Sequence, residues 1–331
     1  MKSNYDKNPG ILIQDISIWT GWDQIINEIN SALNQIDTPK KVLILETYTG
    51  IHDEEIITAI RNLGAKKLII SNESFKKETV IRQMTQNDVT DDRIFGFMTR
   101  LRMQDFLDPQ KIEIIRNQII QIKEGLIVIY GSGSSLIFPE YDLLAYADMA
   151  RWEIQNRMKT HNVHGLGVDD HEMEFSHQYK RGYFVDWRVC DRHKQKLYQK
   201  IDFVLDTNTE QKPKMIRGMD FLYALHQAAN QPFRVVPYFD PGPWGGQWMK
   251  EVCDLDKEKD NFAWCFDCVP EENSLKFFID NEEFETPSIN LVLTQSTQLL
   301  GQAVEERFGK EFPIRFDFLD TMDGGNLSFQ V

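Results

Sequence analysis

Short runs of aliphatic and β-branched residues alternate with helical patterns over the first two thirds of the chain. Apolar runs that each predict a strand occupy 41–46, 67–71, 93–98, 126–130 and 202–206. Between them, residues 53–63 and 141–158 carry apolar positions at helical spacing. Strands that alternate with helices predict a mainly parallel sheet with helices on both faces, which is a three-layer α/β domain.

The pattern changes after a helix predicted at 217–230. Short strand patterns follow at 233–239, 262–269, 274–280 and 288–293, separated by prolines, glycines and other turn residues. Dense aromatic residues in such short strands are typical of a β-sandwich or barrel. We therefore expect two domains, an α/β domain over residues 1–230 and part of a β-rich domain over residues 231–331.

Composition and charge narrow the class of protein. A hydrophobic fraction of 41% and a charged fraction of 27% are typical of a folded globular protein. The N-terminus has no signal-peptide pattern, and no apolar run approaches the roughly 20 residues of a membrane helix. We expect a cytoplasmic protein without a membrane partner. The net charge of −14 also disfavours nucleic acid as a partner, and the oligomeric state is left open.

The loop after the first predicted strand is the first place to look for a ligand site, because ligands bind at the carboxyl ends of parallel strands. It reads TYTGIHDEE over residues 47–55. A nucleotide-binding P-loop would place several glycines and a Lys here, and that Lys is missing. Asp53, Glu54 and Glu55 already complement the positive end of the helix dipole. We therefore interpret this segment as a plain strand-to-helix turn.

A second loop follows the predicted strand 126–130. It contains Gly131, Ser132, Gly133 and Ser134. Small residues allow backbone N–H groups and hydroxyls to converge on an anion, so these four residues are candidates for binding a phosphorylated cofactor. A flexible turn has the same composition and remains an alternative.

Residues 179–196 form a basic segment in an otherwise acidic chain. Arg188 and Arg192 are candidates for a lid that neutralises a bound phosphate, while a solvated basic face is the alternative. The order of strand, loop, helices, basic segment and the late strand 202–206 resembles P-loop kinases of the uridine-kinase or dephospho-coenzyme A kinase type. Since the P-loop Lys is absent, the resemblance implies a degenerate kinase-like domain.

Two other clusters contain side chains that often bind metals. Residues 161–177 hold four histidines, but their spacings match no common ligand pattern, so we favour a structural loop. Cys265 and Cys268 form a CxxC motif without a second pair nearby. On a strand the two thiols would point to opposite faces, so we expect structural cysteines.

The last hundred residues carry a more specific resemblance. A Trp-Gly-Gly turn occupies 244–246, a Trp-containing segment follows at 261–264, and the stretches 312–320 and 327–331 read FPIRFDFLD and LSFQV. In this order they resemble the opening of the catalytic cupin domain in class I mannose-6-phosphate isomerases. The resemblance implies a zinc-dependent interconversion of mannose 6-phosphate and fructose 6-phosphate through an enediol, with a hexose 6-phosphate as substrate.

The resemblance also assigns residues. Gln330 would be a zinc ligand, Ser328 would contact the substrate, and Trp244 would belong to the catalytic site. Asp317 departs from the family, which often has Lys there. The remaining zinc ligands, two His and a Glu, would follow Val331 in a complete protein. We therefore expect this chain to bind no stoichiometric zinc and to show no isomerase activity by itself.

Two alternatives to an isomerase remain open. The α/β domain would be a regulatory module that binds a nucleotide or a sugar phosphate, through the loop at 131–135 and the basic segment. A scaffold that binds no ligand is the third interpretation.

Overall fold

A computed structural model describes residues 10–92, 96–229 and 274–287, together with the backbone of four short strands. The chain divides into two compact units. The larger one, here called the α/β unit, comprises Gly10–Ala224 and Glu271–Pro287. The second unit comprises Met1–Pro9, Leu225–Pro270 and Ser288–Val331.

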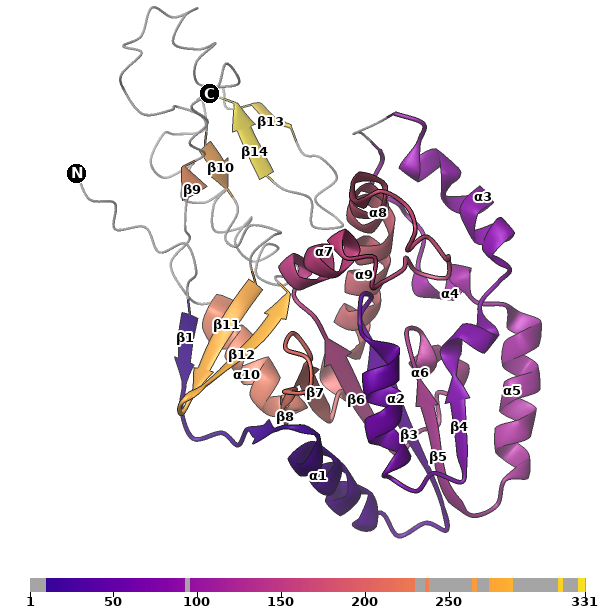
Figure 1. Cartoon of the computed structure of the whole chain (residues 1–331). Helices are drawn as coiled ribbons and strands as arrows, with labels where there is room; N and C mark the ends of the chain where they lie inside the picture. The colour runs from indigo at the N-terminus through magenta and orange to yellow at the C-terminus, as the bar shows by residue number, and fades with distance from the viewer. Residues whose placement is uncertain are drawn as a thin grey trace, which may run out of the picture. The chain divides into compact units, whose positions relative to one another are not determined.

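The α/β unit alternates strands and helices along the chain (Figure 1). Its strands are β1 (Gly10–Ile13), β2 (Trp19–Thr20), β3 (Lys40–Thr47), β4 (Lys67–Ile70), β5 (Gly125–Tyr130), β6 (Leu143–Asp148), β7 (Phe203–Asp206), β8 (Lys214–Arg217), β11 (Ser274–Ile279) and β12 (Glu282–Pro287). Its helices are α1 (Trp22–Asn34), α2 (Asp53–Arg61), α3 (Glu78–Val89), α4 (Met103–Phe106), α5 (Pro109–Gln121), α6 (Ser134–Ile137), α7 (Arg151–Lys159), α8 (Phe175–Arg181) and α9 (Trp187–Leu197). Helix α10 (Gly218–Ala229) closes this part of the chain.

The central sheet has seven strands in the order β2-β8-β7-β6-β3-β5-β4. Strands β4, β5, β3, β6 and β7 run parallel, whereas β8 and β2 pair antiparallel at one edge. In register, Leu45 of β3 lies between Tyr130 of β5 and Ala145 of β6. The mixed α/β class and the mainly parallel sheet expected from the sequence are confirmed. The predicted strands 41–46, 67–71, 126–130 and 202–206 correspond to β3, β4, β5 and β7.

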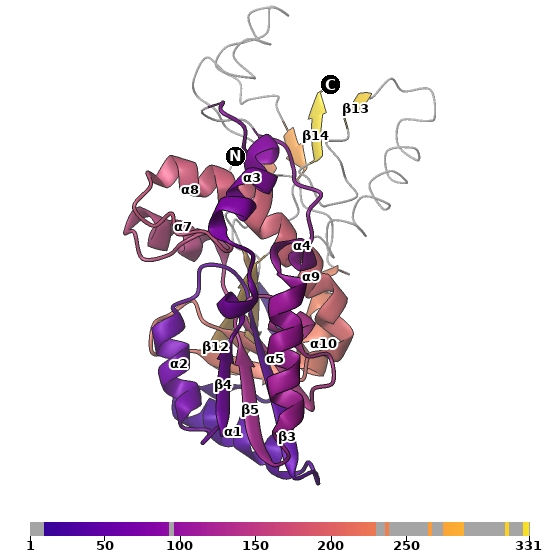
Figure 2. The same ribbon diagram turned by 90° about the vertical axis from the view of Figure 1, so that its right-hand side faces the viewer.

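Both faces of the sheet are covered, as the alternation of side chains along each strand requires. Leu43 and Leu45 of β3 share a core with apolar side chains of α1 and α2, such as Ile29 and Ile60. Figure 2 shows α2 on one side of the sheet and α5 on the other. The sheet therefore forms the middle of three layers.

A hairpin from the downstream sequence completes the α/β unit. Strands β11 and β12 pair antiparallel, and β1 pairs parallel with β11. The ring centroids of Phe284 in β12 and Phe221 in α10 are 6.4 Å apart. The sequence pattern predicts that residues 274–287 belong to the second domain, but they belong to the same compact unit as residues 10–224. Pairing with β1 and these aromatic contacts join distant parts of the sequence, which a local pattern does not reveal.

The second unit contains a four-stranded antiparallel sheet in the order β13-β14-β10-β9. Its strands are β9 (Val236–Pro237), β10 (Trp264–Phe266), β13 (Arg315–Asp317) and β14 (Leu327–Gln330). Ser328 and Gln330 lie on β14, in register with Asp317 and Arg315 of β13. Trp244 and the predicted strand 288–293 lie outside the described residues.

Two predicted elements need correction. The helix predicted at 141–158 is strand β6 followed by helix α7. Because β6 is buried on both faces, its continuous apolar run could not be distinguished from a buried helix by periodicity. The strand predicted at 93–98 is wrong for residues 96–98, which belong to no strand or helix. In the described part of the chain, no helix is both long and apolar enough to cross a membrane.

Candidate functional site

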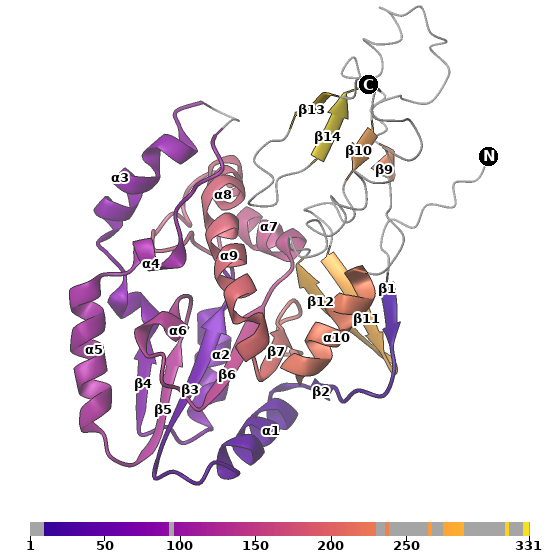
Figure 3. The ribbon, with the colours of Figure 1, turned by 180° about the vertical axis from the view of Figure 1, so that it is seen from behind.

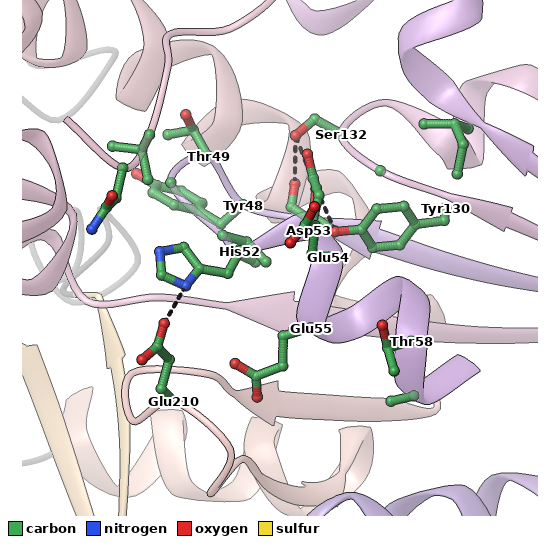
Figure 4. Close-up of a pocket in the computed structure, with 18 of the residues that line it drawn as sticks. Tyr48, Thr49, His52, Asp53, Glu54, Glu55, Thr58, Tyr130, Ser132 and Glu210 are labelled. Carbon is green, nitrogen blue, oxygen red and sulfur yellow. Dashed lines mark hydrogen bonds and ion pairs between the residues drawn. The ribbon is translucent and has the colours of Figure 1, made fainter. Parts of the chain in front are cut away.

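A cleft of about 1240 Å³ opens at the carboxyl ends of β3, β4 and β5 (Figure 4). The chain leaves β3 toward β4 and β5 on one side, and then crosses over to β6 on the other side of β3. Such a switch point leaves a crevice beside the central strand, which is where α/β proteins bind ligands. The fold itself therefore places a candidate ligand site here.

The loop between β3 and α2 forms one wall of the cleft. Gly50 in this loop has a φ of 87°, a left-handed conformation that favours glycine. A Cβ at this position would also lie only 2.8 Å from a side-chain carbon of Ile154. Both conditions explain why the loop needs glycine at this point, independently of any ligand.

The lining of the cleft combines hydroxyl groups, aromatic rings and carboxylates. Trp22, Tyr48 and Tyr130 supply the rings. The carboxylates of the lining belong to Asp23, Asp53, Glu54, Glu55 and Glu210. Among the described lining residues there is no Lys or Arg. The cleft is therefore electronegative, and a free anion would be repelled from it.

Tyr130 and Asp53 tie β5 to the first turn of α2. The Tyr130 hydroxyl donates a hydrogen bond of 2.5 Å to Oδ1 of Asp53. Burial, reinforced by the negative charge of Asp53, raises the pKa of Tyr130 well above its usual value. The phenol therefore keeps its proton, and Asp53 is held at the positive end of the helix dipole, as the sequence predicts for this turn.

Three further side chains of the cleft bring their ligand atoms within 4.8 Å of one another: His52, Glu55 and Glu210. Nδ1 of His52 lies 2.7 Å from Oε1 of Glu210. Oε1 of Glu55 accepts hydrogen bonds of 2.8 Å from Nε1 of Trp22 and from the backbone N–H of Gln211. Imidazole and carboxylate groups in this arrangement are a donor set that could hold a divalent cation.

The loop 131–134 has an anion partner inside the protein. The backbone N–H groups of Gly133 and Ser135 both donate to the carboxylate of Glu46, the latter over 2.9 Å. The Ser134 hydroxyl lies 3.3 Å from the same carboxylate. Converging N–H groups form an anion-binding nest, as expected for this composition. The nest holds a side chain of β3.

Glu46 is fully buried and also pairs with His193 of α9. Oε2 of Glu46 lies 3.3 Å from Nε2 of His193, which in turn lies 3.1 Å from Oγ of Ser135. Burial by itself would raise the pKa of Glu46, but the His193 charge and the hydrogen bonds outweigh burial and lower it. The carboxylate is therefore ionised, and it joins β3, the loop after β5 and α9.

The basic segment is mostly buried. Nε of Arg188 donates over 2.9 Å to the backbone oxygen of Tyr183. The guanidinium of Arg192 donates to the backbone oxygens of Thr99 and Leu101. Neither arginine lines the cleft. The face of α9 that carries Arg188 is thus part of the interior of the fold.

Lys194 is the most completely enclosed cation of α9. Its Nζ donates to the carboxylate of Asp148 at the end of β6 and, over 3.2 Å, to Oγ1 of Thr286 in the hairpin. It also lies 5.2 Å and 5.1 Å from the ring centroids of Tyr146 and Phe221. The charge is compensated by a carboxylate and two aromatic faces.

Three strands carry a buried carboxylate at their carboxyl ends: Glu46 near the end of β3, Asp148 at the end of β6 and Asp206 at the end of β7. His193 of α9 faces Glu46, and Lys194 of α9 faces Asp148. The backbone N–H of Glu285 donates a hydrogen bond of 2.8 Å to Asp206. The sequence contains a signal for this arrangement, since an acidic residue closes each apolar run. That signal does not show which side chains and backbone N–H groups pair with these carboxylates.

The structure therefore separates the residues that the sequence analysis grouped. Gly131 and Ser132 line the cleft, whereas Gly133 and Ser134 contact Glu46. In the histidine loop, His164 lines the cleft, and Nδ1 of His161 lies 2.5 Å from the backbone oxygen of His171. Sequence reasoning missed His52 and Glu210 as neighbours, because they are far apart in the chain.

Comparison with known protein families gives a match to a family without an assigned function. Residues 21–230, more than half of the chain, match the family described as a domain of unknown function, DUF8485. The chain therefore belongs to this family. A comparison with curated proteins found no match.

Proposed function

We propose that, in this member of the DUF8485 family, the cleft binds a neutral, hydroxyl-rich small molecule of the nucleoside or sugar class. The α/β unit would then act as a ligand-binding regulatory module. The observation that supports this most directly is the cleft of about 1240 Å³ at the switch point of the parallel sheet. Ligand pockets of small molecules typically have volumes of about 300 to 1000 Å³, so this open cleft is large enough.

The charge of the lining decides which ligands fit. Five carboxylates and no described Lys or Arg line the cleft, so a phosphate group would enter at an electrostatic cost. Hydroxyl groups of a ribose or hexose donate well to carboxylates, and the half-buried Trp22 offers aromatic surface. A phosphorylated ligand would require a divalent cation, for which His52, Glu55 and Glu210 provide a donor set.

Ligand-induced thermal stabilisation and calorimetric titration test the proposal. We would compare uridine, adenosine, glucose and mannose with the phosphorylated forms, each with and without Mg²⁺. The test variant is Glu54→Ala/Thr58→Ala, because both residues line the cleft and are exposed on α2. The control is Glu113→Ala, an exposed carboxylate on α5.

We expect a nucleoside or sugar to bind the wild type and the control equally, and the cleft variant about tenfold more weakly, which corresponds to about 1.4 kcal/mol. The difference is read from ligand titrations rather than from the melting temperature, because removing Glu54 also weakens the helix dipole interaction. Absence of binding by every compound, or unchanged binding by the cleft variant, would refute the proposal.

A second candidate concerns the last hundred residues. Their resemblance to class I mannose-6-phosphate isomerases is accompanied by an antiparallel sheet in which Ser328 lies in register with Asp317. Such an isomerase would use zinc to polarise the sugar oxygens. Of the residues assigned by resemblance, only Gln330 would be a zinc ligand, and one amide by itself does not hold zinc.

A coupled isomerase assay with added zinc tests the second candidate. We expect no turnover of mannose 6-phosphate by the 331-residue chain. Turnover that disappears in Gln330→Ala would instead show that a metal site forms. Binding of mannose 6-phosphate that is lost in Ser328→Ala would support the substrate assignment without requiring activity.

A further inference from the structure

A second, smaller pocket lies on another side of the α/β unit. It has a volume of about 220 Å³ and shares no lining residue with the cleft. Its walls come from α4, from α6 with the loop that follows it, and from the end of α9, which Figure 3 shows as neighbours. Its ionisable lining residues are Arg102, Tyr141, Arg192, His193, Lys196 and Lys200, and none of the described lining residues is Asp or Glu.

The helix at the end of the basic segment presents its cations to this pocket. Arg192, Lys196 and Lys200 are spaced four residues apart and therefore lie along one face of α9 and the short 3₁₀ turn that continues it. Lys194, two residues from Arg192, points instead toward Asp148 in the interior. The basic segment thus has an inner face that neutralises strand-end carboxylates and an outer face that lines the pocket.

Two of the lining side chains are fixed in place. Arg192 is 9% exposed, and its guanidinium donates to the backbone oxygens of Thr99 and Leu101. His193 is held by Ser135 and by Glu46. Arg102, Lys196 and Lys200 supply further positive charge to the lining.

We propose that this pocket binds a phosphate group, either free phosphate or the phosphoryl end of a small metabolite. Guanidinium and ammonium groups are the usual protein ligands of phosphate, because their charge-assisted hydrogen bonds are stronger than neutral ones. The Ser135 hydroxyl and the Tyr141 phenol add uncharged donors. A volume of about 220 Å³ fits a group of this size and excludes a complete nucleotide.

A plain solvated basic surface is the alternative explanation. Lysines on such a surface would be scattered and accompanied by carboxylates, since Asp and Glu outnumber Lys and Arg by 51 to 37 in this chain. The pocket instead gathers four Arg and Lys residues around buried Ser135 and His193. That selection of one charge sign, next to buried polar side chains, favours an anion site.

Titration calorimetry with inorganic phosphate and with glucose 6-phosphate tests this site. The test variant is Lys196→Gln/Lys200→Gln, since both side chains are exposed and their loss should leave the fold intact. The matched control is Lys67→Gln/Lys123→Gln, which removes two exposed cations away from the pocket. Circular dichroism melting confirms that both variants remain folded.

We expect phosphate to bind the wild type and the control with the same affinity, and the test variant at least tenfold more weakly. Tighter binding of glucose 6-phosphate would identify a metabolite as the source of the phosphoryl group, and equal or weaker binding would identify free phosphate. No phosphate binding by the wild type, or equal binding by the test variant, would overturn the inference. Uncharged ligands of the cleft are unaffected by either variant, so this test and that of the proposed function fail independently.

Discussion

The backbone N–H of Ser135 donates a hydrogen bond of 2.9 Å to the carboxylate of Glu46, which joins the loop after β5 to the neighbouring strand β3. An anion-binding nest is thereby filled by a side chain of the protein. This contact explains how a loop with the composition of a phosphate-binding loop has a structural role. It also places His193 of α9 against the same carboxylate.

Replacement of Glu46 by Gln should destabilise the fold by about 2–4 kcal/mol, because it removes a buried negative charge that His193 and two backbone N–H groups surround. Urea denaturation at neutral pH measures the difference. The exposed Glu113→Gln on α5 serves as a control and should lie within about 0.5 kcal/mol of the wild type. Equal stability of the two variants would contradict the assigned role of Glu46.

Lys194 and Lys196 differ by only two positions, but their environments are opposite. Lys194→Met should cost about 3–5 kcal/mol, since it leaves the buried Asp148 carboxylate without its cation. Lys196→Met, on the exposed side of the same helix, should change the free energy of unfolding by less than about 0.5 kcal/mol. Denaturant unfolding of both variants in parallel checks this contrast, and similar values would mean that Lys194 is not a buried partner of Asp148.

Alanine substitutions at Gly50 and Gly64 distinguish the cost of backbone strain from the cost of steric contact. Both have a positive φ, 87° and 67°, so alanine at either position is strained by about 1 kcal/mol. A Cβ at Gly64 would meet no atom within 4 Å, whereas one at Gly50 would lie 2.8 Å from the side chain of Ile154. Gly50→Ala should therefore be the more destabilising by about 1–3 kcal/mol in thermal or urea unfolding. Equal costs would mean that the loop can move away from Ile154.

The raised pKa of Asp206 makes the stability of the folded protein fall as the pH rises. Burial raises its pKa from 3.8 to about 6, although N–H groups of Asn208 and Glu285 partly oppose this. Between these two values the folded state binds more protons than the unfolded state, so stability falls as pH rises from about 4 to about 6. A shift of this size corresponds to about 3 kcal/mol at most.

Asp206→Asn should remove this contribution and flatten the stability profile between pH 4 and pH 6. The pKa of Asp186 is also raised to about 6, but that carboxyl is present in both proteins and cancels in the difference. Lost hydrogen bonds of Asn208 or Glu285 would shift the whole curve without changing its slope. Parallel slopes for wild type and variant in urea titrations at several pH values would contradict the raised pKa.

The sequence pattern predicted the strands β3, β4, β5 and β7 and the helix α2 because each has a local signal. For β3 and β5 the signal is a continuous apolar run, and for α2 it is a periodic pattern that starts with acidic residues. The pattern failed at residues 143–148. There the strand is buried on both faces, and no polar positions mark its period.

The candidate site was harder to predict from sequence. The residue types of the loop 131–134 made it a candidate anion site, with a flexible turn as the alternative, but its partner Glu46 comes from another strand. Arg188, Arg192 and Lys194 looked alike in the sequence, although only the packed helix determines which of them faces the interior. The neighbours His52 and Glu210 had no local signal, because they follow β3 and β7, which are far apart in the chain and belong to the same sheet.

By itself, the sequence determined that this chain forms a mainly parallel α/β unit with polar loops at the carboxyl ends of its strands. Hydrophobic periodicity and turn residues act over a few positions, so they can be read locally. Only the tertiary structure decided the partner of each charged group and the position of the two pockets. Burial and Coulomb interactions depend on distances between residues that are remote in the chain, and the fold alone sets those distances.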